Sequence, residues 1–156
     1  HLESFIGLPH RCQRIVSDDQ LNWINDSKAT NVGATLAAIN GLSGTLTKDN
    51  KLMLIAGGEG KDADFSPLKV ALSNHVNHLY TLGKDGDKIG ALMDRTTPVS
   101  SLKEAVVQAK SYAKAGDIIL LSPACASFDM FTGYQERGQV FTNAVHSVQE
   151  ASYDGA

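Results

Sequence analysis

Two continuous apolar runs, each ending in a loop of small and polar residues, place the strongest constraint on the fold of this chain. The first run, KLMLIAGG, covers 51–58, and the second, DIILLSPACAS, covers 117–127. A short run that is apolar at every position and then breaks into small residues is typical of a strand buried on both faces. Both runs therefore predict buried strands of a parallel sheet, and VNHLYTLG at 76–83 predicts another strand.

Helical patterns separate these predicted strands. The segment 100–116, SSLKEAVVQAKSYAKAG, has a serine cap, a glutamate near that cap, and apolar residues at steps of three and four before a glycine. The segment 65–74 places Ser66 as a cap and Pro67 at the first helical position. Other helices are expected over 31–42, with Thr30 or Asn31 as its cap, over 85–93, and over 138–151.

The N-terminal part of the chain differs from the rest. RCQRIVS and LNWIN are short, partly alternating runs on either side of DDQ, and together they predict a β-hairpin over 11–25. From Asn31 onward, strands and helices alternate with short connections, which predicts helices on both faces of a mostly parallel sheet. The expectation is one α/β domain over 1–156, a Rossmann-like three-layer domain with an N-terminal β-hairpin.

The overall composition excludes several classes of function. The formal net charge is -3, which gives no electrostatic footprint for nucleic acid, and no apolar run is long enough to cross a membrane. Cys12 and Cys125 do not form a disulfide framework, so a reduced cytoplasmic protein is expected, with Cys125 as a buried, inert thiol. The histidines lack the spacing of metal ligands, so no metal site is predicted.

Polar clusters follow three predicted strands, at the edge of a parallel sheet where ligands usually bind. INDSKAT precedes a helix, so its lysine and hydroxyls form either an anion site or a plain capping loop. GGEGKDADFS fails the GxxxxGKS or GxxxxGKT pattern, because Asp62 follows Lys61. That lysine can hold a carboxylate or simply be solvated. SPACASFD has no GxSxG elbow, so Ser127 is either a ligand donor or a cap.

The chain resembles the C-terminal domain of the Mur ligases, and within that family the members that add D-glutamate. The resemblance rests on GLPHR, NDSKATN, GGEGKDADFSPL, LLSPACASFD and the RG at 137–138, in this order, and it extends over about 2–148. It implies the Rossmann-like third domain of a three-domain enzyme. The UDP-binding domain and the central ATPase domain, which carries the true phosphate-binding loop, are absent from this chain.

The resemblance also implies a reaction. Family members of this type join D-glutamate to UDP-N-acetylmuramoyl-L-alanine in peptidoglycan synthesis, through an acyl phosphate made with ATP. ATP and Mg²⁺ would be bound mainly by the central domain, and no catalytic residue is expected in this one. The isolated domain is therefore expected to be inactive, and a monomeric enzyme is expected.

The residues for D-glutamate are implied position by position. Thr30 and Lys61 match the pair that holds one carboxylate, and Ser127 matches a hydroxyl donor to the other. Tyr134 falls where the family uses a main-chain group. Two carboxylates need two separate sets of donors, and these residues come from different strand ends. A lysine can hold a carboxylate as a point charge, without the fork of an arginine.

The resemblance places three further residues near ATP. Arg11 matches a residue near the phosphates and Asp26 one near the ribose, and Lys28 lies in the same loop as Asp26. These residues would reach the nucleotide when the domain closes over it, which would also expel water from the acyl phosphate.

Other functions remain open at this point. The DNPR string of family members that add a diamino acid is missing from the sequence, which favours D-glutamate. A ligase of the folylpolyglutamate synthetase type is a second possibility. A third is a non-catalytic α/β module that binds a nucleotide or an amino acid, which would fit the missing phosphate-binding loop. Because the chain begins at His1 without a methionine, a piece of a longer protein is expected.

Overall fold

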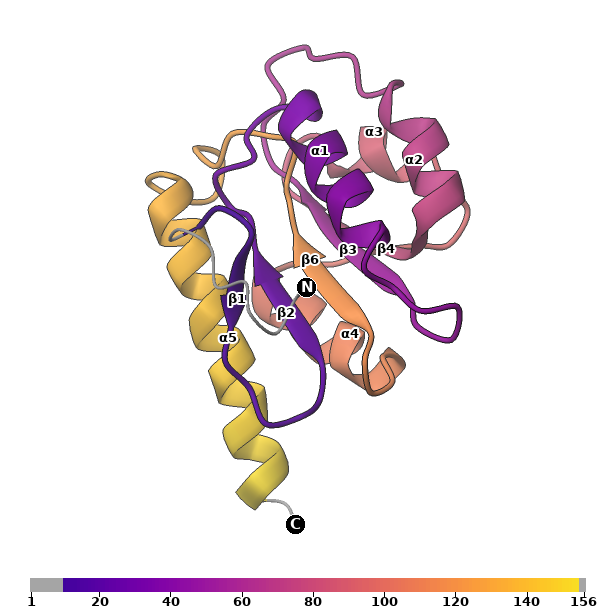
Figure 1. Cartoon of the computed structure of the whole chain (residues 1–156). Coiled ribbons are helices and arrows are strands. Elements are labelled where there is room, and N and C mark those ends of the chain that lie inside the picture. Colours follow the sequence, from indigo (N-terminus) through magenta and orange to yellow (C-terminus); the bar gives the residue numbers. More distant parts are fainter. Residues whose placement is uncertain (1–9, 155–156) are drawn as a thin grey trace.

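A six-stranded sheet forms the centre of the domain (Figure 1). The computed structural model describes residues 10–154. The strand order is β1-β2-β6-β3-β4-β5; β1 pairs antiparallel with β2, and every other pair is parallel. The strands are β1 Gln13–Ile15, β2 Asn22–Asn25, β3 Leu52–Gly57, β4 Val76–Leu82, β5 Thr96–Pro98 and β6 Ile118–Leu121. The predicted hairpin and the mostly parallel sheet are confirmed.

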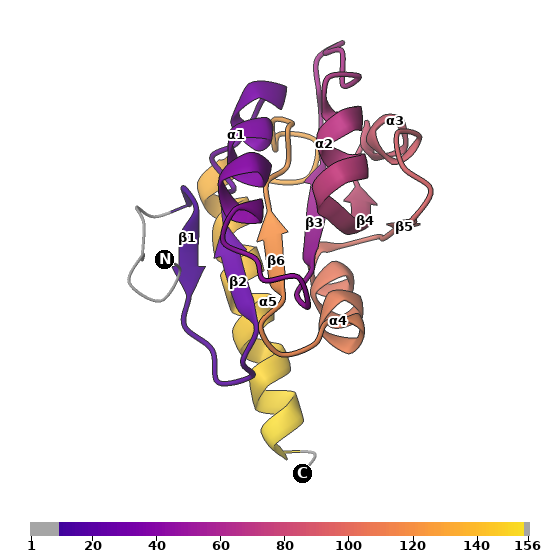
Figure 2. The ribbon, with the colours of Figure 1, turned by 45° about the vertical axis from the view of Figure 1, so that its right-hand side comes forward.

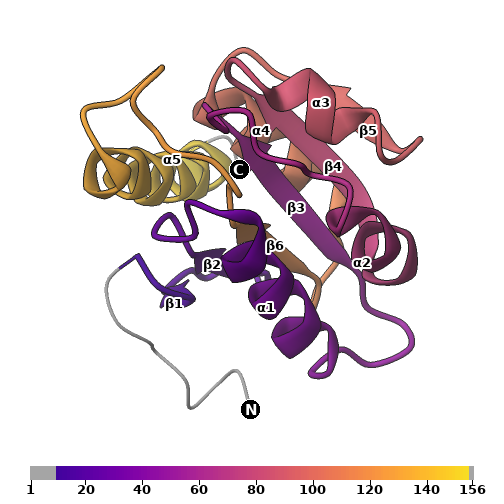
Figure 3. The same cartoon turned by 90° about the horizontal axis from the view of Figure 1, so that it is seen from above.

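Helices cover both faces of this sheet, as Figures 2 and 3 show. The helices are α1 Val32–Ser43, α2 Leu68–His75, α3 Gly86–Gly90, α4 Leu102–Tyr112 and α5 Tyr134–Asp154. The first three pack on one face and α4 and α5 on the other, so that two separate hydrophobic cores form. The Rossmann-like three-layer prediction is confirmed.

The side chains of β3 explain why its sequence is apolar throughout. Leu54 belongs to the core under α1 and α2, whereas Met53 and Ile55 belong to the core under α4 and α5. All three side chains are fully buried. Burying one such side chain contributes about 1.5–3 kcal/mol, so a polar residue at any of these positions would be costly. Trp23 of β2 is likewise fully buried.

The strand order creates a switch point between β3 and β6. These two strands are neighbours, but the chain leaves β3 for α2 on one face and leaves β6 for α5 on the other. In open α/β sheets, ligands bind in the crevice beyond the carboxyl ends of such strands. The loops 58–67 and 122–133 extend from this edge, and the loop 26–31 after β2 lies beside them.

Several predicted helix ends differ from the structure. The helix α3 ends at Gly90, not at 93, and α5 begins at Tyr134, not at 138. The helix α2 begins at Leu68, and Ser66 does not cap it; instead, the amide of Ser66 donates to Asp64 Oδ1 at 3.0 Å. The helix α4 has its predicted cap, Ser101, but ends at Tyr112. The backbone leaves the helical path after Tyr112, because the amide of Lys114 donates to Asp117 Oδ2 at 2.8 Å. The short edge strand β5 was also missed.

Asp19 ties the hairpin turn to the end of α5. Its Oδ2 accepts hydrogen bonds from Trp23 Nε1 at 3.0 Å and Gln149 Nε2 at 2.6 Å, and its Oδ1 accepts one from Ser17 Oγ at 2.8 Å. Burial alone would raise the pKa of Asp19, but the hydrogen bonds from Gln149, Trp23 and Ser17 outweigh it and lower the pKa below 3.8.

The variant Asp19→Asn should therefore lose stability in a pH-dependent way. Because folding lowers the pKa of Asp19, its contribution is present above the unfolded pKa and is lost as pH falls through the folded value. We expect a loss of about 1–3 kcal/mol at pH 7, since the lost bonds go to a charged acceptor. Urea unfolding at pH 7, 5 and 3 measures it. The loss should shrink at pH 3, and Asp18→Asn, exposed in the same turn, is the control. A loss independent of pH would contradict the prediction.

Candidate functional site

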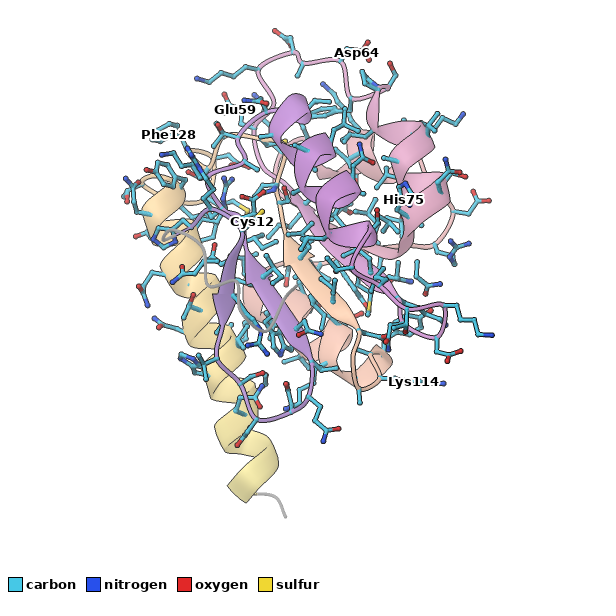
Figure 4. The ribbon with its side chains drawn as sticks, in the orientation of Figure 1. Cys12, Glu59, Asp64, His75, Lys114 and Phe128 are labelled. Carbon is cyan, nitrogen blue, oxygen red and sulfur yellow. The ribbon has the colours of Figure 1, made fainter. Side chains whose placement is uncertain are left out.

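The candidate site lies where the loops after β2, β3 and β6 meet. Figure 4 shows Glu59 of the second loop and Phe128 of the third at the same end of the molecule, with Cys12 nearby. Each loop continues from a strand fixed between buried neighbours, so the three loop starts are held at one edge of the sheet. This is the edge at which the sequence predicted a ligand site.

Backbone hydrogen bonds join the three loops directly. Glu59 and Ala126 form an antiparallel bridge, with N–H to O distances of 3.0 and 2.9 Å. The amide of Ala124 donates to the carbonyl of Ala29 at 3.0 Å. These bonds hold the loop of Lys61 against the loop of Ser127, and the loop of Thr30 against that same loop.

Gly57 and Gly58, at the end of β3, let the backbone approach other parts of the protein closely. Gly57 has φ +135, and a Cβ there would overlap the carbonyl of Leu82; Gly58 has φ +130, and a Cβ there would overlap the carbonyl of Ala126. Only glycine combines this conformation with this closeness. Both glycines therefore set the distance between loops.

The residues predicted for D-glutamate lie on these loops with different exposure. Thr30 and Lys61 are exposed, and Asn31, not Thr30, caps α1 by accepting from the amide of Ala34 at 2.9 Å. Ser127 is only 2% exposed and lines a narrow crevice that leaves room for about one water molecule. Tyr134 is the first residue of α5, where backbone N–H groups have no acceptor within the helix.

The three residues predicted for ATP differ in their exposure. Arg11 and Lys28 are exposed, and Lys28 Nζ lies 5.8 Å from the centre of the Tyr134 ring. Asp26 is 5% exposed, and its two oxygens accept from the amide of Cys12 at 3.1 Å and from Ser122 Oγ at 2.9 Å. Burial raises the pKa of Asp26. Its carboxylate fastens the segment before β1 to the site, and its contact with ATP stays a prediction.

Uncommon backbone conformations gather at this edge. Five non-glycine residues here have positive φ: His10, Cys12, Lys61, Asp62 and Ala124. Such conformations cost on the order of 1 kcal/mol or more each and persist where the surroundings enforce them, often at ligand sites. The surrounding hydrogen bonds do so here, for example the one from the amide of Lys28 to the carbonyl of His10, at 2.8 Å.

Sequence reasoning assigned no role to Arg137, which the structure places at the centre of the site. It is 3% exposed, and it donates to Ser27 and to the carbonyl of Cys125. Its position in the RG pair of the family motif was the only signal in the sequence. A helix pattern alone marks such a residue as a surface arginine.

Other chemistry is limited at this edge. Burial raises the pKa of the Cys125 thiol to about 12 and that of Cys12 to about 12, so both stay protonated and unreactive at neutral pH.

Among residues 10–154, no group of three or more His, Cys, Asp or Glu residues is placed to hold a metal ion. Within the same range, no helix has the length and apolar character needed to cross a bilayer.

Comparison with protein families decides what kind of domain this is. Residues 10–125 match the model of the family described as "Mur ligase, glutamate ligase domain". The chain belongs to the Mur ligases. The family resemblance seen in the sequence motifs is thereby confirmed, and the site described above is the carboxyl edge of a Mur ligase domain.

Two sequence relatives carry the same name. This Mur ligase domain is 60% identical over 151 residues to UDP-N-acetylmuramoylalanine–D-glutamate ligase of Colwellia psychrerythraea, covering 97% of the chain and 32% of that protein. It is 50% identical over 150 residues to the ligase of that name from Legionella pneumophila strain Paris, covering 94% of the chain and 33% of that protein. The chain thus spans about a third of the length of these relatives.

Solved structures of low identity share the fold. The domain matches folylpolyglutamate synthase/dihydrofolate synthase with Mn, AMPPNP and L-glutamate bound, with a TM-score of 0.65, 22% identity, and coverage of 90% of this chain and 32% of that one. It also matches "a domain from a putative UDP-N-acetylmuramate:L-alanyl-gamma-D-glutamyl-medo-diaminopimelate ligase" from Haemophilus ducreyi, with a TM-score of 0.60, 14% identity, and coverage of 86% of this chain and 99% of that one. The chain in that second structure consists of this one domain.

Proposed function

We propose that this Mur ligase domain is the amino-acid-binding domain of an ATP-dependent ligase that adds D-glutamate to UDP-N-acetylmuramoyl-L-alanine. The observation that carries the proposal is the 60% identity, over nearly the whole chain, to a ligase of that name. The folylpolyglutamate synthase structures are much more distant, at 22% identity. The loops that carry Thr30, Lys61 and Ser127 also meet at one edge, which supports one shared ligand.

The proposed site holds the amino acid by its two negative charges. Lys61 and Thr30 hold one carboxylate of D-glutamate, and Ser127 with the main chain of Tyr134 holds the other. Lys61 is exposed, so it can swing toward a ligand, whereas Ser127 is fixed by the turn in which its carbonyl accepts from the amide of Phe131 at 2.8 Å. Two separated anchors orient the amine for attack on the acyl phosphate, and orientation is a large share of rate acceleration.

We propose that ATP approaches the same edge of the sheet from the side of Arg11 and Lys28. Arg11 and Lys28 offer exposed positive charge that fits a polyphosphate. Residues 10–154 contain no preformed group of three or more His, Cys, Asp or Glu side chains for a metal ion. We assign the Mg²⁺ that accompanies ATP to the other domains of the full enzyme, because this chain covers only 32% of the length of a relative. ATP supplies the phosphoryl group that activates the substrate carboxylate.

Arg11→Ala should affect ATP more than D-glutamate. In the full-length enzyme we expect the KM for ATP to rise about tenfold, because one charge-assisted contact to phosphate contributes roughly 1.5–3 kcal/mol. Steady-state kinetics with each substrate varied in turn measures the effect. Arg14→Ala, three residues further along the same segment, is the matched control. An effect confined to the KM for D-glutamate would remove Arg11 from the nucleotide site.

The direct test of the proposed function is an NMR titration of this chain with D-glutamate. L-Glutamate and L-lysine are the controls, since they change the stereochemistry and the charge of the ligand. We expect shifts of the Thr30, Lys61 and Ser127 amides that are larger for D-glutamate. The full-length enzyme should in turn form the amide product only with D-glutamate. A full-length enzyme that neither binds nor uses D-glutamate would refute the proposal.

A further inference from the structure

The buried side chain of Arg137 links three of the segments that carry the proposed site. Its Nε donates to Ser27 Oγ at 3.0 Å and its Nη2 to the carbonyl of Ser27 at 2.6 Å. Its Nη1 donates to the carbonyl of Cys125 at 3.0 Å. Arg137 itself lies in the first turn of α5. One guanidinium therefore holds the loop after β2, the loop after β6 and the start of α5 together.

Ser27 extends this link to the backbone of the site. Its hydroxyl accepts from Arg137 and donates to the carbonyl of Tyr134 at 2.7 Å, and its amide donates to Asn25 Oδ1 at 3.1 Å. Ser27 is fully buried, so water does not compete for these bonds. A shift of the Arg137 guanidinium would therefore move the Ser27 hydroxyl, which bonds the carbonyl of Tyr134.

The charge on Arg137 has no ionic partner among the residues that the structure describes. The ion pairs in that part of the chain are Lys88 with Asp85 and Lys110 with Asp19, and neither includes Arg137. Asp129 lines the same narrow crevice as Arg137 and Ser127 but does not pair with the guanidinium. Burial lowers the pKa of Arg137 to about 10, so it stays positive at neutral pH.

A buried positive charge whose hydrogen bonds all go to neutral oxygens is expensive, because it has lost water without gaining a direct carboxylate partner. The nearby charge of Asp129 offsets only part of this cost, since the pKa of Arg137 is still lowered by burial. The protein retains this charge beside Ser127, which is proposed to face a ligand carboxylate. An anionic ligand at that point would offset the cost of burying the charge. If the only role of Arg137 were to link these carbonyls, a neutral donor would serve.

From these contacts we propose that Arg137 is a positioning residue for amino-acid binding, acting through Ser27 and the backbone of Cys125 and Tyr134. It sets the relative placement of Ser127 and Tyr134, and its charge raises the positive potential at the carboxylate they bind. This inference rests on the proposed function, because it assumes a dicarboxylic amino acid at this edge. It adds a residue that touches no substrate itself.

The test compares variants of the full-length enzyme. Arg137→Lys keeps the positive charge but loses the planar guanidinium and its three separate contacts. Ser27→Ala removes the hydrogen bond to the carbonyl of Tyr134 with a small change in volume. Arg95→Lys is the matched control, since Arg95 also donates to backbone carbonyls, those of Asn77 and Val76, at the opposite end of the sheet. Each variant is assayed for the KM of D-glutamate, the KM of ATP, and its melting temperature.

For Arg137→Lys we expect the KM for D-glutamate to rise about tenfold or more, and for Ser27→Ala severalfold, with the KM for ATP within about twofold. Arg95→Lys should lower the melting temperature without changing either KM. If Arg137→Lys does not fold, Ser27→Ala decides the question. Unchanged D-glutamate kinetics in the folded variants would overturn the inference alone, whereas a wild-type enzyme that does not use D-glutamate would overturn the proposed function as well.

Discussion

Replacing Gly57 with alanine should strongly destabilise the domain. Gly57 ends β3 with φ +135, and a Cβ there would overlap the carbonyl of Leu82 at the end of β4. Its amide also donates to the carbonyl of Pro123 at 3.0 Å, so the backbone cannot shift away without losing that bond. A backbone overlap in a packed region cannot be relieved by a side-chain rotation. It costs at least about 3 kcal/mol, a large part of the stability of a small domain.

Chemical denaturation with circular dichroism detection measures this effect. The control is Gly41→Ala in α1, where a Cβ meets nothing within 4 Å. That change should stabilise the domain by about 0.5–1 kcal/mol, because alanine restricts the unfolded chain and favours a helix. A loss of stability in Gly57→Ala and a gain in Gly41→Ala would show that the local backbone conformation decides how a glycine-to-alanine change affects stability. A folded Gly57→Ala variant of wild-type stability would mean that the loops after β3 and β4 can separate.

Replacing Lys61 with alanine should impair D-glutamate binding with little effect on the fold. Lys61 is exposed in the loop after β3, so its removal should change the free energy of unfolding by no more than about 0.5 kcal/mol. In the proposed site it holds a carboxylate. A charge-assisted hydrogen bond shielded from water contributes about 1.5–3 kcal/mol, which corresponds to a rise of roughly 10- to 150-fold in the KM for D-glutamate.

Steady-state kinetics of the full-length enzyme tests this prediction. Lys69→Ala is the matched control, because Lys69 is an exposed lysine on α2, close to the same loop in the sequence. Its removal should leave the KM for D-glutamate unchanged. An unchanged KM in Lys61→Ala would assign the carboxylate to a different residue and leave Lys61 as a solvated turn residue.

The sequence predicted most of the fold because its signals are local. The apolar runs at 51–58 and 117–127 placed β3 and β6 correctly, and the period of the helix patterns placed α1 and α4. Helix ends were less accurate, since distant or nearby carboxylates decided them, as Asp117 does for α4. The strand β5 has only three residues and contains a proline, so no run or alternation marked it.

The sequence predicted that the three polar clusters meet at one edge of the sheet, and the structure brings their loops together there. The contacts within this group of loops were not predicted. The burial of Asp26, the closeness of Gly57 to β4 and the bonds of Arg137 all join residues far apart in the chain. Such contacts exist only once the strand order is known, and the pattern of a single sequence does not give that order.

The position of β6 also has a consequence for how the chain acquires its structure. This strand lies between β2 and β3, but it is the last strand to be synthesised. Until Ile118–Leu121 leave the ribosome, β2 has no neighbour on that side, and β3 lacks one of its two. The first hundred residues therefore cannot complete the sheet on their own. Pairing across such long sequence separations is slow, so a nascent chain that stalls before β6 would expose apolar strand edges to aggregation.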